Sequence, residues 1–412
     1  MTPNNKPSPK YFFSLDAIRG FAALIVVLCH WQFYFYEDQT LQTKPLEELG
    51  VPLYPYLSIF YHHAFFAVDL FFLLSGFIFF WFYADKIADR KTPFGNFMCY
   101  RITRLYPVHL ITLISLVFIQ YVMRSMNGHT FIIQNNDTYH FILNLLAIHS
   151  WGFEKTPALN GFNGPSWSMS VELLLYLLFF LLAWKNLHRH KLLIIGIVVA
   201  GAVIQYVYSM IGQGIYSFFL GGLSYHLYAW MVEQKNVRRI ANIVTVAAVL
   251  LWAVVVTEYA FSYIRDISMI VMKKVLSGKD EAFHTALFNL SRNTFFRTII
   301  SPVTILTLAL TETTRGSLKI KWALVLGNAS YALYLIHFPL MVVFFIMVDI
   351  LGLSRDVFHS PLTLLTFYAV LIPLSILTHY YFELPIQDLF RKRLLRKPSP
   401  GLVTAVNKQI TT

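Results

Sequence analysis

Two ionisable residues in the first apolar segment are spaced as a ligand-binding pair would require. Arg19 and His30 are eleven positions apart, which on an α-helix is about 20° beyond three full turns and about 16 Å along the axis. Ala23 and Val26 lie between them on the same face, and their small side chains predict a shallow groove. Such a face could hold a long ligand with an anionic head group. The alternative is an arginine that reaches toward the membrane surface and a structural, hydrogen-bonded histidine.

Three more ionisable residues fall inside other apolar segments: Asp69, Glu172 and His337. Counting about 1.5 Å per residue from the end of each segment places them, with His30, in the middle to outer part of a bilayer. Ionisable groups at this depth are costly and usually functional. We therefore predict a polar cavity at this level. A structural hydrogen-bond network between helices is the alternative.

Three arginines are predicted near one membrane interface, away from the level of the polar cavity. Arg101 and Arg104 are i,i+3 neighbours before the third apolar segment, so they face the same way if this turn is helical. With Arg19 they place three guanidinium groups near one interface. The planar fork of arginine suits phosphate. The alternative is the ordinary excess of basic residues in cytoplasmic loops.

A polar stripe and one cysteine complete the candidate residues. Ser330, Tyr334 and His337 are at i, i+4 and i+7 and share one helix face, either as a binding stripe or as satisfied packing residues. Cys29 is interpreted as a small hydrophobic residue. We predict no metal site, because no cysteine or histidine spacing matches one.

The elements that carry these residues are membrane spans. The chain has 412 residues, of which 57% are hydrophobic and only 13% charged, against about 25% charged in soluble domains. We predict an all-α, polytopic membrane protein without a large soluble domain and without nucleic acid as a partner. Ten transmembrane helices are expected, at residues 14–36, 59–83, 105–124, 166–184, 191–210, 214–232, 240–264, 295–312, 322–349 and 361–382.

Charge asymmetry predicts the orientation. With ten spans, 23 lysines and arginines fall on the side of both termini and 10 on the other side, so both termini are expected in the cytoplasm. The segment 139–150 is too short to span and is predicted to be re-entrant or interfacial. We expect one transmembrane domain over residues 1–390 and a basic cytoplasmic tail over 391–412.

Six motifs along the chain resemble signatures of the acyltransferase 3 family. They are "LDAIRGFAALIVVLCH" (15–30), "VDLFFLLSGF" (68–77), "RITRLYP" (101–107), "PSWSMSVELLLY" (165–176), "SYALYLIHFPL" (330–340) and "FELP" (382–385). Each is weak by itself, but together and in order they cover about residues 11–390. Met169 and Leu173 depart from the common form of the fourth motif without touching its core pattern.

The resemblance implies an integral-membrane O-acyltransferase of the cell inner (plasma) membrane. Such an enzyme passes an acyl group, usually acetyl, from cytoplasmic acyl-CoA to a hydroxyl of an extracytoplasmic or lipid-linked saccharide. His30 matches the essential histidine of the family, and Arg19, Arg101 and Arg104 match its CoA-associated arginines. The acceptor, the acyl length and the oligomeric state, a homo-oligomer included, stay open.

Joining both lines, we expect CoA phosphates at the arginines and the pantetheine arm along Ala23 and Val26. His30 would act as general base, with Glu172 or Asp69 orienting its imidazole; a transient acyl-His30 is the other route. We expect His337, Tyr334 and Trp167 to contact the substrate. The rival hypotheses are a proton-coupled transporter or flippase of glycolipid, and a membrane acyltransferase of an unrelated family.

Overall fold

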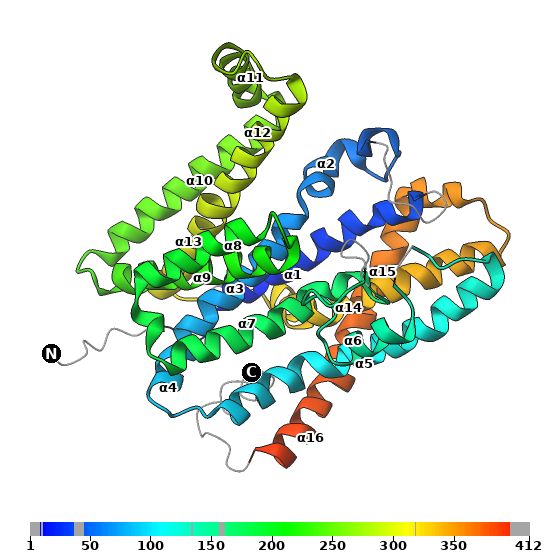
Figure 1. Cartoon of the computed structure of the whole chain (residues 1–412), viewed down its shortest axis with the longest axis horizontal. Helices are drawn as coiled ribbons and strands as arrows, with labels where there is room; N and C mark the ends of the chain where they lie inside the picture. Colours follow the sequence, from blue (N-terminus) through cyan, green and yellow to red (C-terminus); the bar gives the residue numbers. More distant parts are fainter. Residues whose placement is uncertain are drawn as a thin grey trace.

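The computed structural model describes residues 9, 11–36, 45–132, 135–155, 161–317 and 319–395, and this part of the chain is helical, with no β-strand (Figure 1). Most of the predicted tail 391–412 lies outside the described residues. The α-helices are α1 (Phe13–His30), α2 (Tyr54–His63), α3 (Phe65–Phe82), α4 (Ala84–Ala88), α5 (Phe94–Asn127), α6 (Thr138–Leu145), α7 (Trp167–Trp184), α8 (Lys191–Ile204), α9 (Ser209–Glu233), α10 (Val237–Phe261), α11 (Tyr263–Val275), α12 (Glu281–Phe295), α13 (Ser301–Arg315), α14 (Lys321–Ile350), α15 (Pro361–Thr378) and α16 (Leu384–Leu394). Short π-helical turns join α12 to α13 and α15 to α16.

Eight helical segments of the described chain are long and apolar enough to cross a membrane, which confirms a polytopic all-α protein. They overlap eight of the ten predicted spans. The other two predicted spans are also helical. However, α8 has only 14 residues, about 21 Å of helix, and α9 is long enough but less apolar than the eight. The polar residues of α9 explain the difference, because Gln213 and Ser217 interrupt its apolar sequence.

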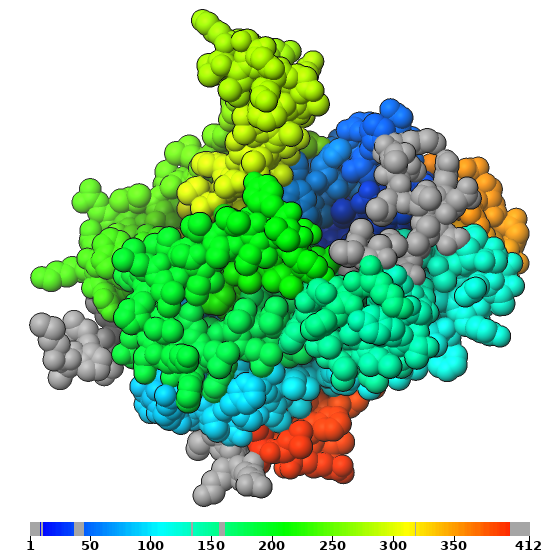
Figure 2. All heavy atoms as spheres, viewed as in Figure 1, coloured from blue at the N-terminus to red at the C-terminus, as the bar shows by residue number. Residues whose placement is uncertain are grey.

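The arginine pair of "RITRLYP" is inside a helix rather than in front of one. α5 begins at Phe94, eleven residues before the predicted start at 105, and runs to Asn127 without a break. Arg101 and Arg104 therefore lie on one continuous helix face, as their spacing predicts. The segment 265–294, between the seventh and eighth predicted spans, is also helical. It forms most of the pair α11 and α12, which stands out from the body of the molecule (Figure 2).

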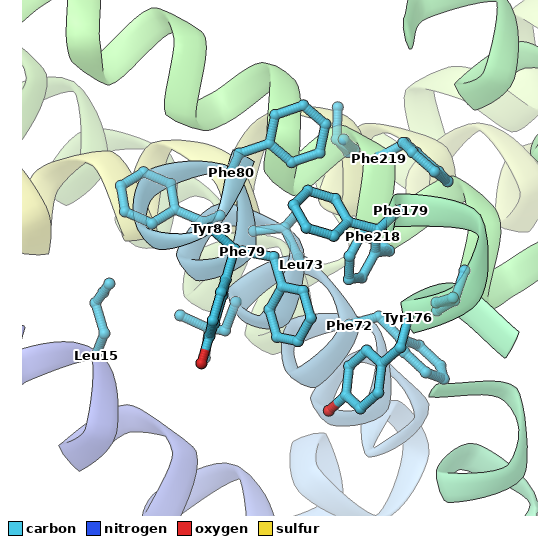
Figure 3. Packing of buried hydrophobic residues seen from close by; sticks show 14 of the residues in the cluster. Leu15, Phe72, Leu73, Phe79, Phe80, Tyr83, Tyr176, Phe179, Phe218 and Phe219 are labelled. Carbon is cyan, nitrogen blue, oxygen red and sulfur yellow. The ribbon is translucent and has the colours of Figure 1, made fainter. Parts of the chain in front are cut away.

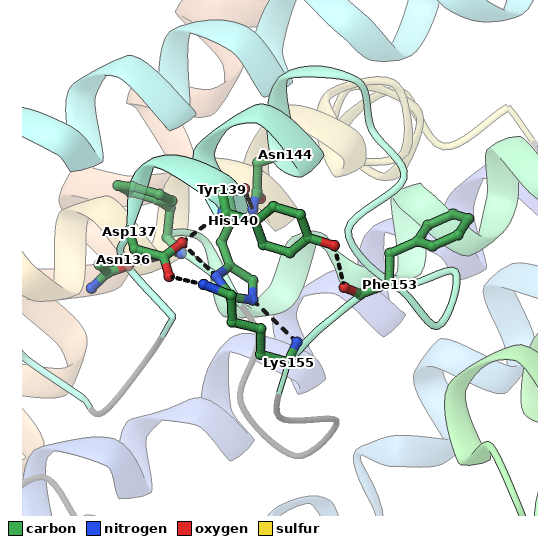
Figure 4. A network of polar contacts seen from close by, with 8 residues as sticks. Asn136, Asp137, Tyr139, His140, Asn144, Phe153 and Lys155 are labelled. Carbon is green, nitrogen blue, oxygen red and sulfur yellow. Dashed lines mark hydrogen bonds and ion pairs between the residues drawn. The ribbon is translucent and has the colours of Figure 1, made fainter.

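The short segment 139–150 contains only the eight-residue helix α6, which is too short to span a bilayer. Asp137 caps this helix, accepting hydrogen bonds from the backbone N–H of His140 at 2.8 Å and from its imidazole at 2.6 Å, while Lys155 pairs with the other carboxylate oxygen at 3.1 Å (Figure 4). The backbone N–H of His140 and then its imidazole hold the pKa of Asp137 below its usual range. This network fastens α6 to the segment that leads into α7.

Two glycines let α1 and α14 touch backbone to backbone. A Cβ atom on Gly327 would lie 2.2 Å from the carbonyl oxygen of Asp16, and one on Gly20 would lie 2.9 Å from the amide nitrogen of Gly327. The start of α1 is fixed as well. Glu312 of α13 accepts hydrogen bonds from the amides of Phe13 and Ser14 at 2.9 and 3.0 Å, which satisfies the free N–H groups of the first turn.

A second glycine contact joins α3 to α9 in the same way. A Cβ atom on Gly76 would lie 1.8 Å from the carbonyl oxygen of Phe218, and one on Gly221 would lie 2.0 Å from that of Leu73. Aromatic rings fill the space beside this contact and bring in α7, with Phe79 stacked on Tyr176 at 4.7 Å between ring centroids (Figure 3). The helices that carry the predicted site residues are thus held by close backbone contact and a dense aromatic core.

The close contact at Gly327 predicts a specific sensitivity. Gly327→Ala should lower the free energy of unfolding by roughly 1–3 kcal/mol, the usual cost of overpacking, because the new methyl group meets backbone that cannot turn away. The measurement is thermal unfolding of the purified protein in detergent. Gly196→Ala is the control, since a Cβ atom there meets nothing within 4 Å. Equal unfolding midpoints for the two variants would contradict the contact.

Candidate active site

A cavity of about 940 Å³ opens among α1, α3, α5, α7, α14 and α16, and its lining contains all three predicted arginines. Arg19 pairs with Asp16 one turn earlier at 3.5 Å. Arg101 donates a hydrogen bond to the hydroxyl of Tyr83 at 2.7 Å, and its guanidinium carbon lies 5.0 Å from the centroid of that ring. Together with Arg104 they make one end of the cavity strongly cationic, and we call it the arginine end.

The middle of the cavity is apolar on one side and carries a carboxylate on the other. Phe71, Leu74 and Ile78 of α3 form the apolar side. Glu172 of α7 lines the cavity too, and its carboxylate accepts hydrogen bonds from the hydroxyls of Tyr176 at 2.5 Å and Ser75 at 3.2 Å. A cavity with a cationic end and an apolar wall suits a long ligand with an anionic head group.

The expected groove along Ala23 and Val26 is wrong. Both side chains are buried in the packed core, Ala23 at 0% and Val26 at 2% exposure, and neither lines the cavity. Their small size serves the close packing of α1 against its neighbours. The cavity instead runs from Arg19 along α3 and ends near Ser168 and Tyr334.

Ser168 and Tyr334 close the end of the cavity opposite the arginines. The Tyr334 hydroxyl accepts a hydrogen bond from Ser168 at 2.9 Å and donates one to the carbonyl oxygen of Pro165 at 2.7 Å. Trp167, expected to contact substrate, does not line the cavity, and its ring packs against Phe72 with centroids 6.1 Å apart. The motif "PSWSMSVE" thus supplies Ser168 to the end wall and the carboxylate of Glu172 to the cavity, while Pro165 anchors Tyr334.

His30 and His337 lie directly behind this end wall and contact each other. His30 Nδ1 is 2.8 Å from His337 Nε2, and the rings are nearly parallel, 7° apart. His337 is fully buried, with its ring 5.9 Å from that of Tyr334 between centroids. His30 is partly exposed and stacks on Phe33 at 4.8 Å. Neither histidine lines the cavity.

The expected carboxylate partner of His30 is not in place. Of the contacts among the described residues, the polar contact of the His30 side chain is with His337, while Glu172 is bound by Tyr176 and Ser75. In the hydrogen bond between the two imidazoles, one nitrogen must carry a proton and the other must not. His337 can thus fix the tautomer of His30. Sequence reasoning assigned this role to Glu172 or Asp69.

Asp69 belongs to a separate buried cluster, where its side chain is 2% exposed. Its carboxylate accepts hydrogen bonds from Arg297 at 2.8 Å and Ser217 at 2.6 Å. Arg297 also donates to Gln205 at 2.8 Å and lies over the ring of Tyr216. This cluster joins α3, α9 and the residue that follows α8 to the π-turn after α12, so Asp69 is occupied as the partner of a partly buried arginine.

The sequence reasoning missed Arg297, the contact between the two histidines, and Arg391 of α16, which also lines the cavity. Arg297 lies only two residues inside the predicted span 295–312, so counting from the span end gave no reason to pair it with Asp69. Arg391 was counted only as part of a basic tail. An observable signal was the spacing of polar residues at every fourth position before it.

Comparison with known proteins gives one family match and two relatives that match part of the chain. A family model described as an acyltransferase domain matches residues 12–380. "Acyltransferase MdmB" of Streptomyces mycarofaciens is 35% identical over 181 residues, which are 43% of this chain and 40% of that protein. "Protein 2 in picA locus" of Rhizobium radiobacter is 35% identical over 105 residues, 26% of this chain and 44% of that protein. The chain thus spans less than half the length of these curated relatives, and no solved structure matches it.

The ion pair of Asp69 predicts a coupled effect on stability. Arg297→Gln should lower the free energy of unfolding by roughly 3–5 kcal/mol, because it leaves the Asp69 carboxylate buried and unpaired. Adding Asp69→Asn should recover most of that loss, since the charge itself is then removed. Unfolding of each variant in detergent measures the coupling. A double variant no more stable than Arg297→Gln would show that the two side chains do not act as a pair.

Proposed function

This chain belongs to the acyltransferase 3 family, and from that membership we propose that it moves an acyl group, most simply acetyl, from cytoplasmic acyl-CoA to a hydroxyl of an extracytoplasmic or lipid-linked saccharide. The observation that carries the proposal is one cavity with three arginines at one end and an imidazole pair behind the other. Arginine forks suit the phosphates of CoA, and a neutral imidazole suits the activation of a hydroxyl.

The proposed topology follows from the same charges. We propose ten spans, with the short α8 and the less apolar α9 crossing as part of the bundle, and both chain termini in the cytoplasm. The arginine end of the cavity then faces the cytoplasm, where acyl-CoA is made, and His30 lies toward the outer side. The inner (plasma) membrane is the proposed location, and the basic residues before α5 support this orientation.

In the proposed reaction His30 acts as the general base through Nε2. In this scheme the proton of the 2.8 Å contact with His337 Nε2 is on His30 Nδ1, which leaves the lone pair of His30 Nε2 free. The acceptor hydroxyl gives its proton to His30 as its oxygen forms a bond to the thioester carbonyl carbon. The C–S bond then breaks, and the CoA thiolate takes the proton from His30. His337 is a positioning residue in this scheme.

Donor and acceptor reach His30 from different sides. The partly exposed side of His30, beside Phe33, is the proposed approach of the acceptor hydroxyl. The thioester comes through the cavity and has to pass the end wall at Tyr334, which lies next to His337. Glu172, held by Tyr176 and Ser75, is proposed to line the path of the pantetheine arm rather than to contact the base.

The decisive test of function uses the strain that carries the gene. Deletion of the gene should remove ester-linked acetyl groups from an envelope saccharide, seen by mass spectrometry, and the wild-type gene should restore them. Purified protein in vesicles should release CoA from acetyl-CoA when the membrane saccharide lipids of that strain are added. An unchanged envelope, together with no acceptor-dependent CoA release, would reject the acyltransferase assignment to saccharides.

The histidine pair predicts graded losses of transfer. His30→Ala should lower kcat by about 10²–10⁴-fold, the usual contribution of a general base. His337→Gln should retain more activity than His337→Phe, because its amide oxygen can still accept from His30 Nδ1. Initial rates on purified protein in vesicles measure this order, with acetyl-CoA binding checked for each variant. Equal activity of the two His337 variants would contradict the positioning role.

The arginine end predicts a change in donor affinity rather than in chemistry. Arg101→Ala should raise the KM for acetyl-CoA by about tenfold, since a charge-assisted hydrogen bond is worth roughly 1.5–3 kcal/mol, and leave kcat largely unchanged. Arg239→Ala, which removes an exposed arginine away from the cavity, is the matched control. An unchanged KM in a well-folded Arg101→Ala protein would argue against phosphate binding there.

A further inference from the structure

A ladder of polar side chains runs along the last helical segment of the described chain. His379, Glu383, Gln387 and Arg391 are four residues apart, and each is hydrogen-bonded to the next, at 2.9, 2.8 and 2.7 Å. The ladder begins in the π-turn His379–Glu383 and continues along α16. Side chains at this spacing share a helix face, and here that face lines the cavity.

The ladder is buried, so its order is tightly determined. Glu383 is 2% and Gln387 4% exposed, and each carboxylate oxygen of Glu383 accepts a different hydrogen bond, one from His379 and one from Gln387. Gln387 donates to Glu383 through its amide nitrogen and accepts from Arg391 through its amide oxygen. Because the nitrogen and the oxygen of its amide are both hydrogen-bonded, Gln387 can hold Arg391 in only one orientation.

The end of the ladder reaches the arginine pair of α5. Arg391 donates through Nε to the hydroxyl of Thr103 at 3.3 Å, and its guanidinium carbon lies 5.4 Å from the centroid of the Tyr100 ring. Thr103 lies in the sequence between Arg101 and Arg104, both of which line the same cavity. Among the described residues, no carboxylate lies within 4.0 Å of the nitrogens of Arg101, Arg104 or Arg391, the criterion for an ion pair.

Carboxylates are present in the cavity but are held elsewhere. Glu383 is bound within the ladder, Glu172 by Tyr176 and Ser75, and Asp16 by Arg19. Asp388, one turn before Lys392 on α16, also lines the cavity. Arg391 is repelled by the positive charges of Arg101 and Arg104, and a ligand anion that reaches all three would compensate them together. A ligand with more than one phosphate has the required charge and the geometry that guanidinium forks bind.

We propose that Arg391, held in place by this ladder, is a further phosphate-binding residue of the donor cavity, and that α16 is part of the binding site for a polyphosphate-bearing thioester. The inference rests on the proposed function, because it assigns the head group of the donor. Gln387 is a positioning residue, and Arg391 contacts the phosphates together with Arg101 and Arg104.

The test compares two donors on the full-length protein in vesicles. Acetyl-CoA carries the phosphates, whereas acetyl-pantetheine has the same thioester and arm without any phosphate. Arg391→Ala should lower kcat/KM for acetyl-CoA about tenfold and leave kcat/KM for acetyl-pantetheine unchanged. Arg391→Lys should lie between the two, since it keeps the charge but loses the fork. Gln387→Leu should act in the same direction as Arg391→Ala.

Arg393→Ala is the matched control, because it removes the same charge from the exposed side of α16 and should leave both donors unaffected. Equal losses on both donors in Arg391→Ala would show a structural effect and overturn the inference. Unchanged acetyl-CoA kinetics would overturn it as well. Failure of the proposed function is distinguishable, since the wild-type protein would then neither bind nor use either donor.

Discussion

Helix α1 touches helix α14 backbone to backbone at Gly20 and Gly327, and the placement of the site depends on this contact. His30 and His337 each lie ten residues beyond their glycine, about 15 Å further along helices that run in the same direction. The register set at the glycines therefore brings the two imidazoles to the same height, where they meet at 2.8 Å. Arg19 is next to Gly20 in sequence, so the same contact fixes one cation of the arginine end.

Helix α1 thus fixes the distance between Arg19 and His30, at the two ends of the site. The other helices enclose the space around it. Glu312 fixes where α1 begins by binding its first amides. The close contact of α3 with α9 and the aromatic core behind it leave α3 to form the apolar wall of the cavity. A rigid separation between a cationic end and an imidazole suits a ligand whose reactive group is distant from its charge.

Sequence reasoning predicted correctly that His30 and His337 lie at one height, but it did not predict the partners of the ionisable groups. Counting residues from span ends placed His30, Asp69, Glu172 and His337 at one level. The structure distributes them over three environments: a histidine pair, a buried ion pair and a cavity wall. Depth follows from helix rise alone, whereas the direction of a side chain depends on which faces of two helices touch. Which helix faces touch is determined here by close glycine contacts, such as Gly76 with Phe218. The hydrophobic periodicity of the sequence does not reveal these contacts.

Two partly buried arginines, Arg297 and Arg391, differ in what compensates their charge. Arg297 is bound to Asp69 by an ion pair inside the core, and its charge is compensated within the chain. Arg391 is hydrogen-bonded instead to neutral groups, the Gln387 amide and the Thr103 hydroxyl. Neutral partners orient a guanidinium without cancelling its charge. Since a cation held inside an apolar protein is costly unless compensated, this arrangement is stable where an anion or water can reach it, which the cavity allows.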